Sequence, residues 1–532
     1  MTIHNPILRG FNPDPSICRV GKTFYIATST FEWFPGVQIH ASEDLSSWKL
    51  VSRPLTRPEQ LDMLGNPDSC GVWAPCLSYA DGQFWLIYTN VRRHQGNYKD
   101  TPNFLVTAPS IEGPWSDPIP LNSSGFDPSL FHDDDGRKWL VNQLWDHRAT
   151  MPGRDEKDYF GGIVLQEYDP VAKRLIGPVK KIFERSQLGR TEGPHLMKRK
   201  GWYYLVLAEG GTGYTHAVTH ARSRTIEGPY ALHPDVHLLS TKDAPESPLQ
   251  RVGHGQVVEA EDGTVWHSFL CTRPIADRRS QMGRETGIEK MVWGDDGWLR
   301  RAGVGVVPST TIEAGKSEQA DASETVTFDG PALPMAFQWL RTPHPERLFS
   351  LTARPGRLRL FGRESVGSWF EQSLVARRMT EHSCSAETEV EFSPETYQQQ
   401  AGLIAYYGRY QFHYAYVTLA DNGTRRLSIQ SCNGDFPTAV LTFPIGEGII
   451  LGEGPVSLRL DVVRETFQFS FRQGDADWQK LGPALDALVL ADESGPGDSN
   501  NFTGTFLGMC AQDLSGSAQV ADFSYFAYRT GE

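Results

Sequence analysis

Residues 10–17 read Gly-Phe-Asn-Pro-Asp-Pro-Ser-Ile, so an acid stands between two prolines at the start of an apolar run. Proline fixes its own φ and biases the preceding residue towards extended backbone, so we expect Asp14 to adopt a β conformation at the mouth of a strand. A turn glycine, Gly21, and an aromatic run at 24–26 follow, and this order is typical of a β-hairpin. The stretch therefore predicts a hairpin that begins at Asp14 and holds its carboxylate in a fixed direction.

This hairpin unit occurs five times. Each copy has a strand start, a turn glycine and an aromatic second strand, and the starts at residues 14, 74, 127, 193 and 254 are 60, 53, 66 and 61 residues apart. A period of about 60 residues with several strands is typical of a β-propeller blade, because each small sheet buries its faces only against its neighbours. We therefore predict an all-β chain with a five-bladed β-propeller at residues 1–312. The alternative is a string of unrelated hairpins.

The pattern changes after the propeller. Residues 313–325 are small, polar and charged without an apolar period, which predicts a linker. Residues 326–532 show alternating strands with hairpin turns such as Asp421-Asn422-Gly423. Alternation of this kind predicts a separate β-sandwich.

The charge balance restricts the partners of the chain. A formal net charge of -13, without a basic patch, disfavours nucleic acid and anionic membrane surfaces as partners. Residues 1–6 lack the features of a signal peptide, and no run approaches the roughly 18 apolar residues of a membrane helix. The seven cysteines are scattered without close pairs, which favours free thiols in a reducing compartment. We expect a cytoplasmic protein.

The inner strands of a propeller line a central channel, so equivalent strand starts converge at one end of it. This register places Asp14, Asp127 and His254 together, with Trp73 and Glu192 one residue earlier in blades two and four. An isolated acid beside proline is more often a turn or cap residue. Three acids at one channel end repel each other, however, so they either bind a cation or perform acid/base chemistry.

Tryptophans near these strand starts favour a sugar substrate. Trp33, Trp73 and Trp145 offer flat faces that stack on a sugar ring, although packing between blades is the alternative for each. Cleavage of a glycoside needs one protonated carboxyl to donate to the leaving oxygen and one ionised carboxyl to activate water or attack. A third acid can raise the pKa of the donor by repulsion.

The acidic motifs at residues 12–15, 125–129 and 191–195, together with Gly283-Arg284-Glu285-Thr286, resemble glycoside hydrolase family 43 and, within it, intracellular β-xylosidases that act in xylan degradation. The resemblance implies a single-step inverting mechanism with Asp14 as general base, Glu192 as general acid, and Asp127 tuning the acid and positioning substrate. It implies an exo-acting enzyme that removes D-xylose from the non-reducing end of β-1,4-xylo-oligosaccharides. The alternatives are an α-L-arabinofuranosidase acting on arabinofuranosides, a bifunctional enzyme, and a non-catalytic carbohydrate-binding propeller.

The same resemblance implies the rest of the site. The sandwich is expected to be concanavalin-like and to close the pocket through residues 501–508, with Phe506 as the contacting ring. No cofactor is required, but a calcium ion in the propeller channel, facing His254 through water, is left open. The family often forms homodimers or homotetramers. The expected substrate-binding residues are Phe31, Trp73, Trp145, Thr212, His254, Arg284 and Phe506.

Overall fold

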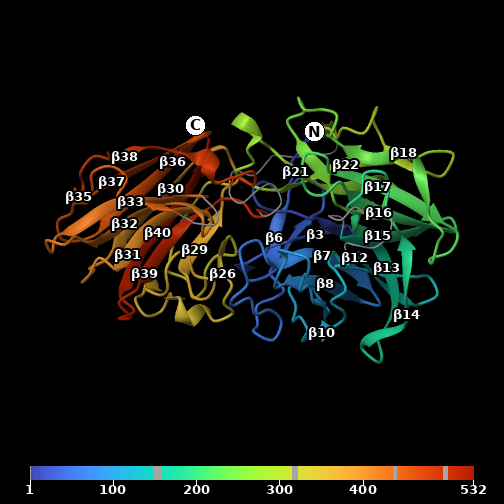
Figure 1. The fold of residues 1–532 in the computed structure, drawn as a ribbon, viewed down its shortest axis with the longest axis horizontal. Coiled ribbons are helices and arrows are strands. Elements are labelled where there is room, and N and C mark those ends of the chain that lie inside the picture. Colours follow the sequence, from blue (N-terminus) through green and yellow to red (C-terminus); the bar gives the residue numbers. More distant parts are fainter. Residues whose placement is uncertain (1, 149–158, 314–321, 435–439, 495–500, 532) are drawn as a thin grey trace.

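The computed structural model describes residues 2–148, 159–313, 322–434, 440–494 and 501–531, and these form two β domains side by side (Figure 1). Within these ranges the helical segments are the short 3₁₀ turns η1 (Ala276–Arg278), η2 (Pro345–Arg347) and η3 (Ala487–Val489). No helix among the described residues has the length and apolar character to cross a membrane.

The N-terminal domain is a five-bladed β-propeller, which confirms the prediction. The first strands of successive blades, from β2 to β7, β11 and β15, contact one another around the centre. Each blade is an antiparallel sheet that follows chain order from its first strand outwards. The blades are β2 (Ser16–Val20), β3 (Thr23–Thr28), β5 (Gln38–Ser42), β6 (Lys49–Ser52); β7 (Gly71–Ala80), β8 (Gln83–Val91), β9 (Asn103–Ala108), β10 (Ile119–Pro120); β11 (Ser129–His132), β12 (Lys138–Trp145), β13 (Phe160–Asp169), β14 (Arg174–Phe183); β15 (Glu192–Arg199), β16 (Trp202–Glu209), β17 (Ala217–Ser223), β18 (Ala231–Ser240); and β19 (Gln250–Gly253), β20 (Val257–Glu259), β21 (Val265–Thr272), β22 (Glu285–Trp293), β23 (Leu299–Arg301).

The first strand of every blade contains a residue with positive φ or begins two positions after one. The expected extended backbone at Asp14 is therefore wrong, because its φ is 57°. In blades two, four and five the strand register shifts at this point, which is the signature of a β-bulge, and a bulge turns a side chain away from the regular alternation. In blade five the residue is Arg251, three positions before His254. The five residues are Asp14, Ala74, Asp127, Gly193 and Arg251.

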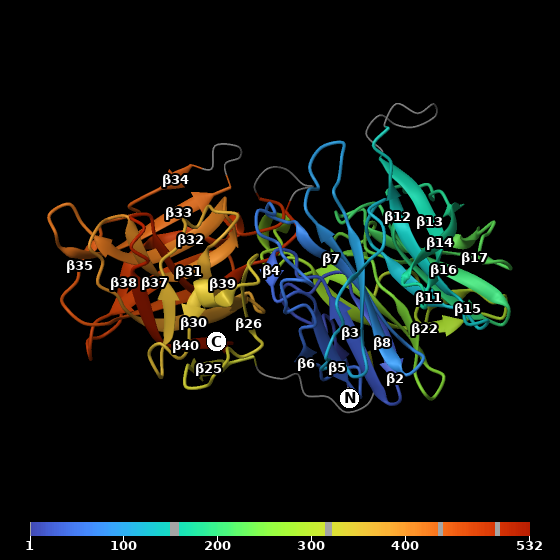
Figure 2. The same cartoon turned by 90° about the horizontal axis from the view of Figure 1, so that it is seen from below.

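The C-terminal domain is a sandwich of two antiparallel sheets, also as predicted (Figure 2). Apolar side chains of both sheets, such as Leu403 and Phe469, share one buried core. One sheet contains β25 (Glu324–Thr327), β27 (Phe349–Ser350), β28 (Leu358–Phe361), β30 (Ser383–Glu391), β36 (Val456–Val463), β37 (Thr466–Arg472), β38 (Gln479–Asp486) and β40 (Val520–Thr530). The other contains β26 (Phe337–Leu340), β29 (Ser373–Arg378), β31 (Gln399–Gly408), β32 (Gln411–Leu419), β33 (Arg425–Asn433), β34 (Leu441–Thr442), β35 (Ile449–Ile450) and β39 (Phe506–Asp513).

The two domains share a strand. β4 (Trp33–Phe34) lies in the connection between β3 and β5 of blade one, yet it pairs with β26 at the edge of the sandwich sheet. On the linker side, β1 (Thr2–His4) pairs with β24 (Thr311–Glu313). Most of the predicted linker, residues 314–321, lies outside the described residues. The domains are consequently joined by a common sheet as well as by the linker.

Candidate active site

A cavity of about 930 Å³ opens at the end of the propeller channel. Nine of the ten predicted site residues line it, and the exception is Phe506. The nine are Asp14, Phe31, Trp73, Asp127, Trp145, Glu192, Thr212, His254 and Arg284. Sequence reasoning missed several lining residues, among them His94, Lys99, Phe126, Tyr159, Phe160, Arg190 and Phe502. Phe126 and Arg190 stand next to the acidic motifs at 125–129 and 191–195, and Phe502 lies in the 501–508 stretch, so their positions in the sequence could have indicated them. His94, Lys99 and Tyr159 lie outside the strands and carry no repeated motif.

Asp14 is held by two donors. Ser29 Oγ donates to Asp14 Oδ2 at 2.7 Å, and Arg284 Nη1 donates to Oδ1 at 2.9 Å. Asp14 and Arg284 are both buried. A carboxylate that receives a guanidinium N–H and a hydroxyl has its charge compensated and its orientation fixed. The Asp14 carboxyl group therefore has a fixed orientation within the cavity.

Glu192 and Asp127 have a different environment. Burial raises the pKa of Glu192 to about 8, and the nearby negative charge of Asp14 adds to this. The pKa of Asp127 is also raised well above its usual range, first by burial and then by Glu192 and Asp14. The Gly193 N–H donates to Asp127 Oδ2 at 3.0 Å, which fixes the backbone next to Glu192. At neutral pH Glu192 consequently holds a proton.

His254 lies beside Asp127, with 3.8 Å between His254 Nδ1 and Asp127 Oδ2. Burial lowers the pKa of His254, so its ring is neutral. The neighbouring ring is another imidazole, His195, at 6.2 Å between centroids. Calcium prefers six to eight oxygen ligands, and the described residues contain no group of three or more His, Cys, Asp or Glu side chains that could hold a metal. This donor set does not fit direct calcium binding, and an ion held beside His254 through water is the alternative that the sequence analysis left open.

Aromatic rings form the side wall of the cavity. Trp73 packs against Phe31 and Phe126, with centroids 5.7 and 5.5 Å away. The Lys99 ammonium lies 4.3 Å from the centre of the Trp145 ring, and burial lowers the pKa of Lys99 to about 8. Flat apolar walls beside a few charged groups are typical of a sugar pocket.

Two domain families match this chain. Residues 3–299 match the family described as Glycosyl hydrolases family 43. The chain belongs to this family. Residues 325–529 match the Beta xylosidase C-terminal Concanavalin A-like domain. Both domains of this family 43 chain are thereby assigned, and the fold and glycosidase class predicted from its motifs are confirmed.

Relatives of this family 43 chain match it over its full length. It is 54% identical to Xylosidase/arabinosidase 43B of Humicola insolens, over 99% of this chain and 97% of the relative. It is 45% identical to Beta-xylosidase of Bacillus subtilis (strain 168), over 99% and 100%. The crystal structure of xylan beta-1,4-xylosidase from Bacillus Halodurans C-125 superposes with a TM-score of 0.95 at 48% identity, covering 99% of this chain and 100% of that one.

The sandwich of this family 43 chain contributes a ring to the pocket, but it is Phe502 and not Phe506. Phe506 is fully buried and stacks on Trp33 with 3.7 Å between ring centroids, and neither ring lines the cavity. The expectations for Phe506 and Trp33 are thus corrected. Phe506 is the first residue of β39, and its ring fills the apolar interface between sheet and propeller. Phe502 precedes the strand, so its ring can reach Trp73 at 5.8 Å.

Proposed function

We propose that this chain is an exo-acting β-xylosidase that removes D-xylose from the non-reducing end of β-1,4-xylo-oligosaccharides with inversion. One observation carries the proposal. A single cavity holds a carboxylate bound to a guanidinium, Asp14, and a second carboxyl, Glu192, whose pKa is raised to about 8. This is the division into base and acid that glycoside hydrolysis needs at neutral pH.

In the proposed reaction Glu192 gives its proton to the glycosidic oxygen as the bond to the anomeric carbon breaks. A water molecule attacks that carbon from the opposite face, and Asp14 accepts the proton that the water loses. Inversion requires base and acid to be about 6.5 to 9.5 Å apart so that the water fits between base and sugar. Asp127 holds the Gly193 N–H and thereby positions the backbone of Glu192. No cofactor takes part in these steps.

Exo cleavage is supported by the sandwich loop. The Phe502 ring lies among the Phe31, Trp73 and His94 rings, with centroids 5.7 to 6.3 Å away, and so covers one side of the cavity. A pocket covered in this way admits a chain end more readily than the middle of a polymer. The sugar released at each turnover is then a single xylose.

The second candidate is α-L-arabinofuranosidase activity, because a relative at 54% identity is named as both a xylosidase and an arabinosidase. The test compares kcat/KM on an aryl β-D-xyloside and on an aryl α-L-arabinofuranoside. We expect the xyloside value to be higher, and a higher arabinoside value would reverse the assignment. Proton NMR of the first xylose formed is expected to show the α-anomer, and β-xylose would refute inversion.

A further inference from the structure

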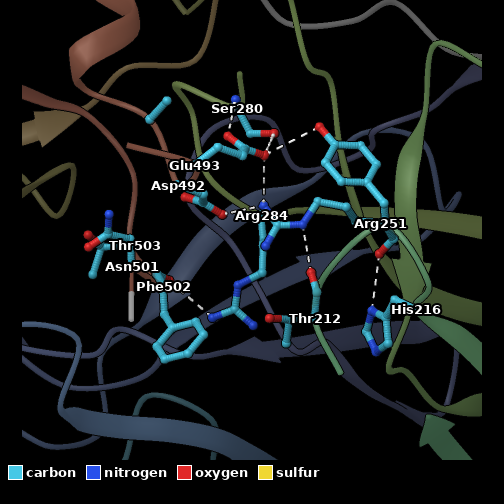
Figure 3. Close-up of polar contacts among 12 residues, drawn as sticks. Thr212, His216, Arg251, Ser280, Arg284, Asp492, Glu493, Asn501, Phe502 and Thr503 are labelled. Atoms are coloured by element: carbon cyan, nitrogen blue, oxygen red, sulfur yellow. Dashed lines mark hydrogen bonds and ion pairs between the residues drawn. The ribbon is translucent and has the colours of Figure 1, made fainter. Parts of the chain in front are cut away.

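The sandwich reaches the active site by a second route, through two consecutive carboxylates. Asp492 and Glu493 follow η3 and accept from the same guanidinium. Arg251 Nη1 donates to Asp492 Oδ2 at 2.8 Å and to Glu493 Oε1 at 3.2 Å (Figure 3). Arg251 and Asp492 are almost completely buried. We call Arg251, Asp492 and Glu493 the clasp, because they connect blade five to the sandwich.

The clasp is bound on both sides. Glu493 also accepts from the Ser280 backbone N–H at 2.7 Å and from Ser280 Oγ at 3.0 Å. Asp492 accepts from Tyr407 Oη at 2.7 Å. Each carboxylate therefore has a further donor besides Arg251. A buried ion pair satisfied in this way has a defined geometry, and removal of one partner leaves the other charge uncompensated.

Arg251 also binds a segment of the cavity wall. Its Nε donates to the backbone carbonyl of Thr212 at 2.6 Å, and Thr212 lines the cavity (Figure 3). Residues 210–213 read Gly-Gly-Thr-Gly, so their backbone has little intrinsic preference for one conformation. The ends are anchored in blade four, where Gly210 N–H donates to the Gly189 carbonyl and His216 N–H to the Gly213 carbonyl. The middle of this segment is held by the hydrogen bond from Arg251 to the Thr212 carbonyl.

The same part of the sandwich also reaches Arg284. Tyr407 Oη, which donates to Asp492, accepts from the Thr503 N–H at 3.2 Å. The residue before Thr503 is Phe502, whose carbonyl accepts from Arg284 Nη2 at 3.0 Å. Arg284 in turn binds Asp14. Within the sandwich, Tyr407 thus connects Asp492 to the loop at Phe502 and Thr503 that covers the cavity.

We propose that Arg251 and Asp492 are positioning residues: the sandwich acts through the Arg251 guanidinium to hold the Thr212 segment in the conformation that binds the sugar. This rests on the proposed function. The clasp touches neither Asp14 nor Glu192 in the described contacts, so it acts on substrate binding more than on the chemical step. The clasp uses three hydrogen bonds from two nitrogens of the Arg251 guanidinium, one from Nε and two from Nη1. A lysine ammonium cannot reproduce this planar arrangement of donors.

The test compares Arg251→Lys and Asp492→Asn with a matched control, Arg279→Ala. Arg279 Nη1 donates to Ser494 Oγ at 2.6 Å, so it also joins propeller to sandwich, but it does not line the cavity. Full-length variants are assayed on the aryl β-xyloside, and thermal melting checks folding. We expect Arg251→Lys to raise KM by about tenfold, as for loss of one charge-assisted hydrogen bond, with a much smaller change in kcat. Asp492→Asn should raise KM in the same direction, and Arg279→Ala should leave KM unchanged.

Three results would contradict the proposal that the clasp positions the Thr212 segment. These are an unchanged KM in a folded Arg251→Lys protein, an equal rise in KM for Arg279→Ala, and a loss confined to kcat. If Arg251→Lys does not fold, Asp492→Asn decides by the same criteria, since it keeps the shape and the Tyr407 contact. A wild type without turnover on either aryl glycoside would refute the proposed function together with the clasp. An active wild type with unchanged variants refutes the clasp alone.

Discussion

Replacement of Glu192 by glutamine gives the sharpest test of the acid. With a pKa of about 8, Glu192 is about nine-tenths protonated at pH 7 and about one-tenth protonated at pH 9. We therefore expect wild-type kcat/KM to fall through an alkaline limb near pH 8. A positioned general acid contributes about a hundredfold to ten-thousandfold in rate, or about 3 to 5 kcal/mol of activation free energy. Glu192→Gln should lose a factor in this range on a poor leaving group.

The assay uses two aryl β-xylosides with leaving groups of high and low pKa, measured from pH 5 to pH 10. The variant should lose the alkaline limb and should retain more activity on the low-pKa leaving group, which needs no proton. Folding provides an independent check. The folded-state pKa of Glu192 is raised, so its contribution to stability is present in full below the ordinary pKa and is lost as pH rises towards 8. The decrease in melting temperature from pH 5 to pH 9 should therefore be smaller for Glu192→Gln than for the wild type. An unchanged alkaline limb in the variant, or equal losses on both leaving groups, would refute the assignment of the acid.

Three other predictions test the remaining parts of the site. Asp14→Ala should lower kcat by at least about a hundredfold, as expected for loss of a general base, and should also lower the melting temperature, because the buried Arg284 guanidinium loses its carboxylate; near-normal turnover would favour a non-catalytic binding propeller. Phe502→Ala should raise KM and leave stability almost unchanged, whereas Phe506→Ala should cost about 3 to 5 kcal/mol of unfolding free energy; denaturant titration and kinetics of the pair would show the reverse if Phe506 were the pocket ring. Treatment with EDTA should leave kcat/KM unchanged, and a loss restored by calcium would show that an ion acts in the channel.

The sequence predicted what is repeated and local. Five copies of one hairpin specified the propeller, and their register brought Asp14, Asp127 and Glu192 to one cavity. It did not predict contacts between segments far apart in the chain, such as Arg251 with Asp492. The backbone at Asp14 was mispredicted because the preference of a residue before proline is local, whereas the strand start is set by pairing with the next strand.

The error at Phe506 has a similar origin. Residues 501–508 contain two phenylalanines, and the sequence does not show where the strand begins. Once β39 starts at Phe506, strand pairing places that ring against Trp33, and only the earlier ring is free to enter the pocket. Lys99 illustrates a different limit, because a lysine in a loop carries no pattern that distinguishes the inside of a cavity from solvent.

The pairing of β4 with β26 has a consequence for how the protein is made. Trp33 pairs with Leu340, so the aromatic face of blade one has no partner until most of the chain has left the ribosome. Phe506, which stacks on Trp33, is synthesised later still. A nascent chain that ends after the propeller therefore exposes an unpaired strand and a tryptophan. The pocket therefore lacks its Phe502 wall until that part of the sandwich has been synthesised.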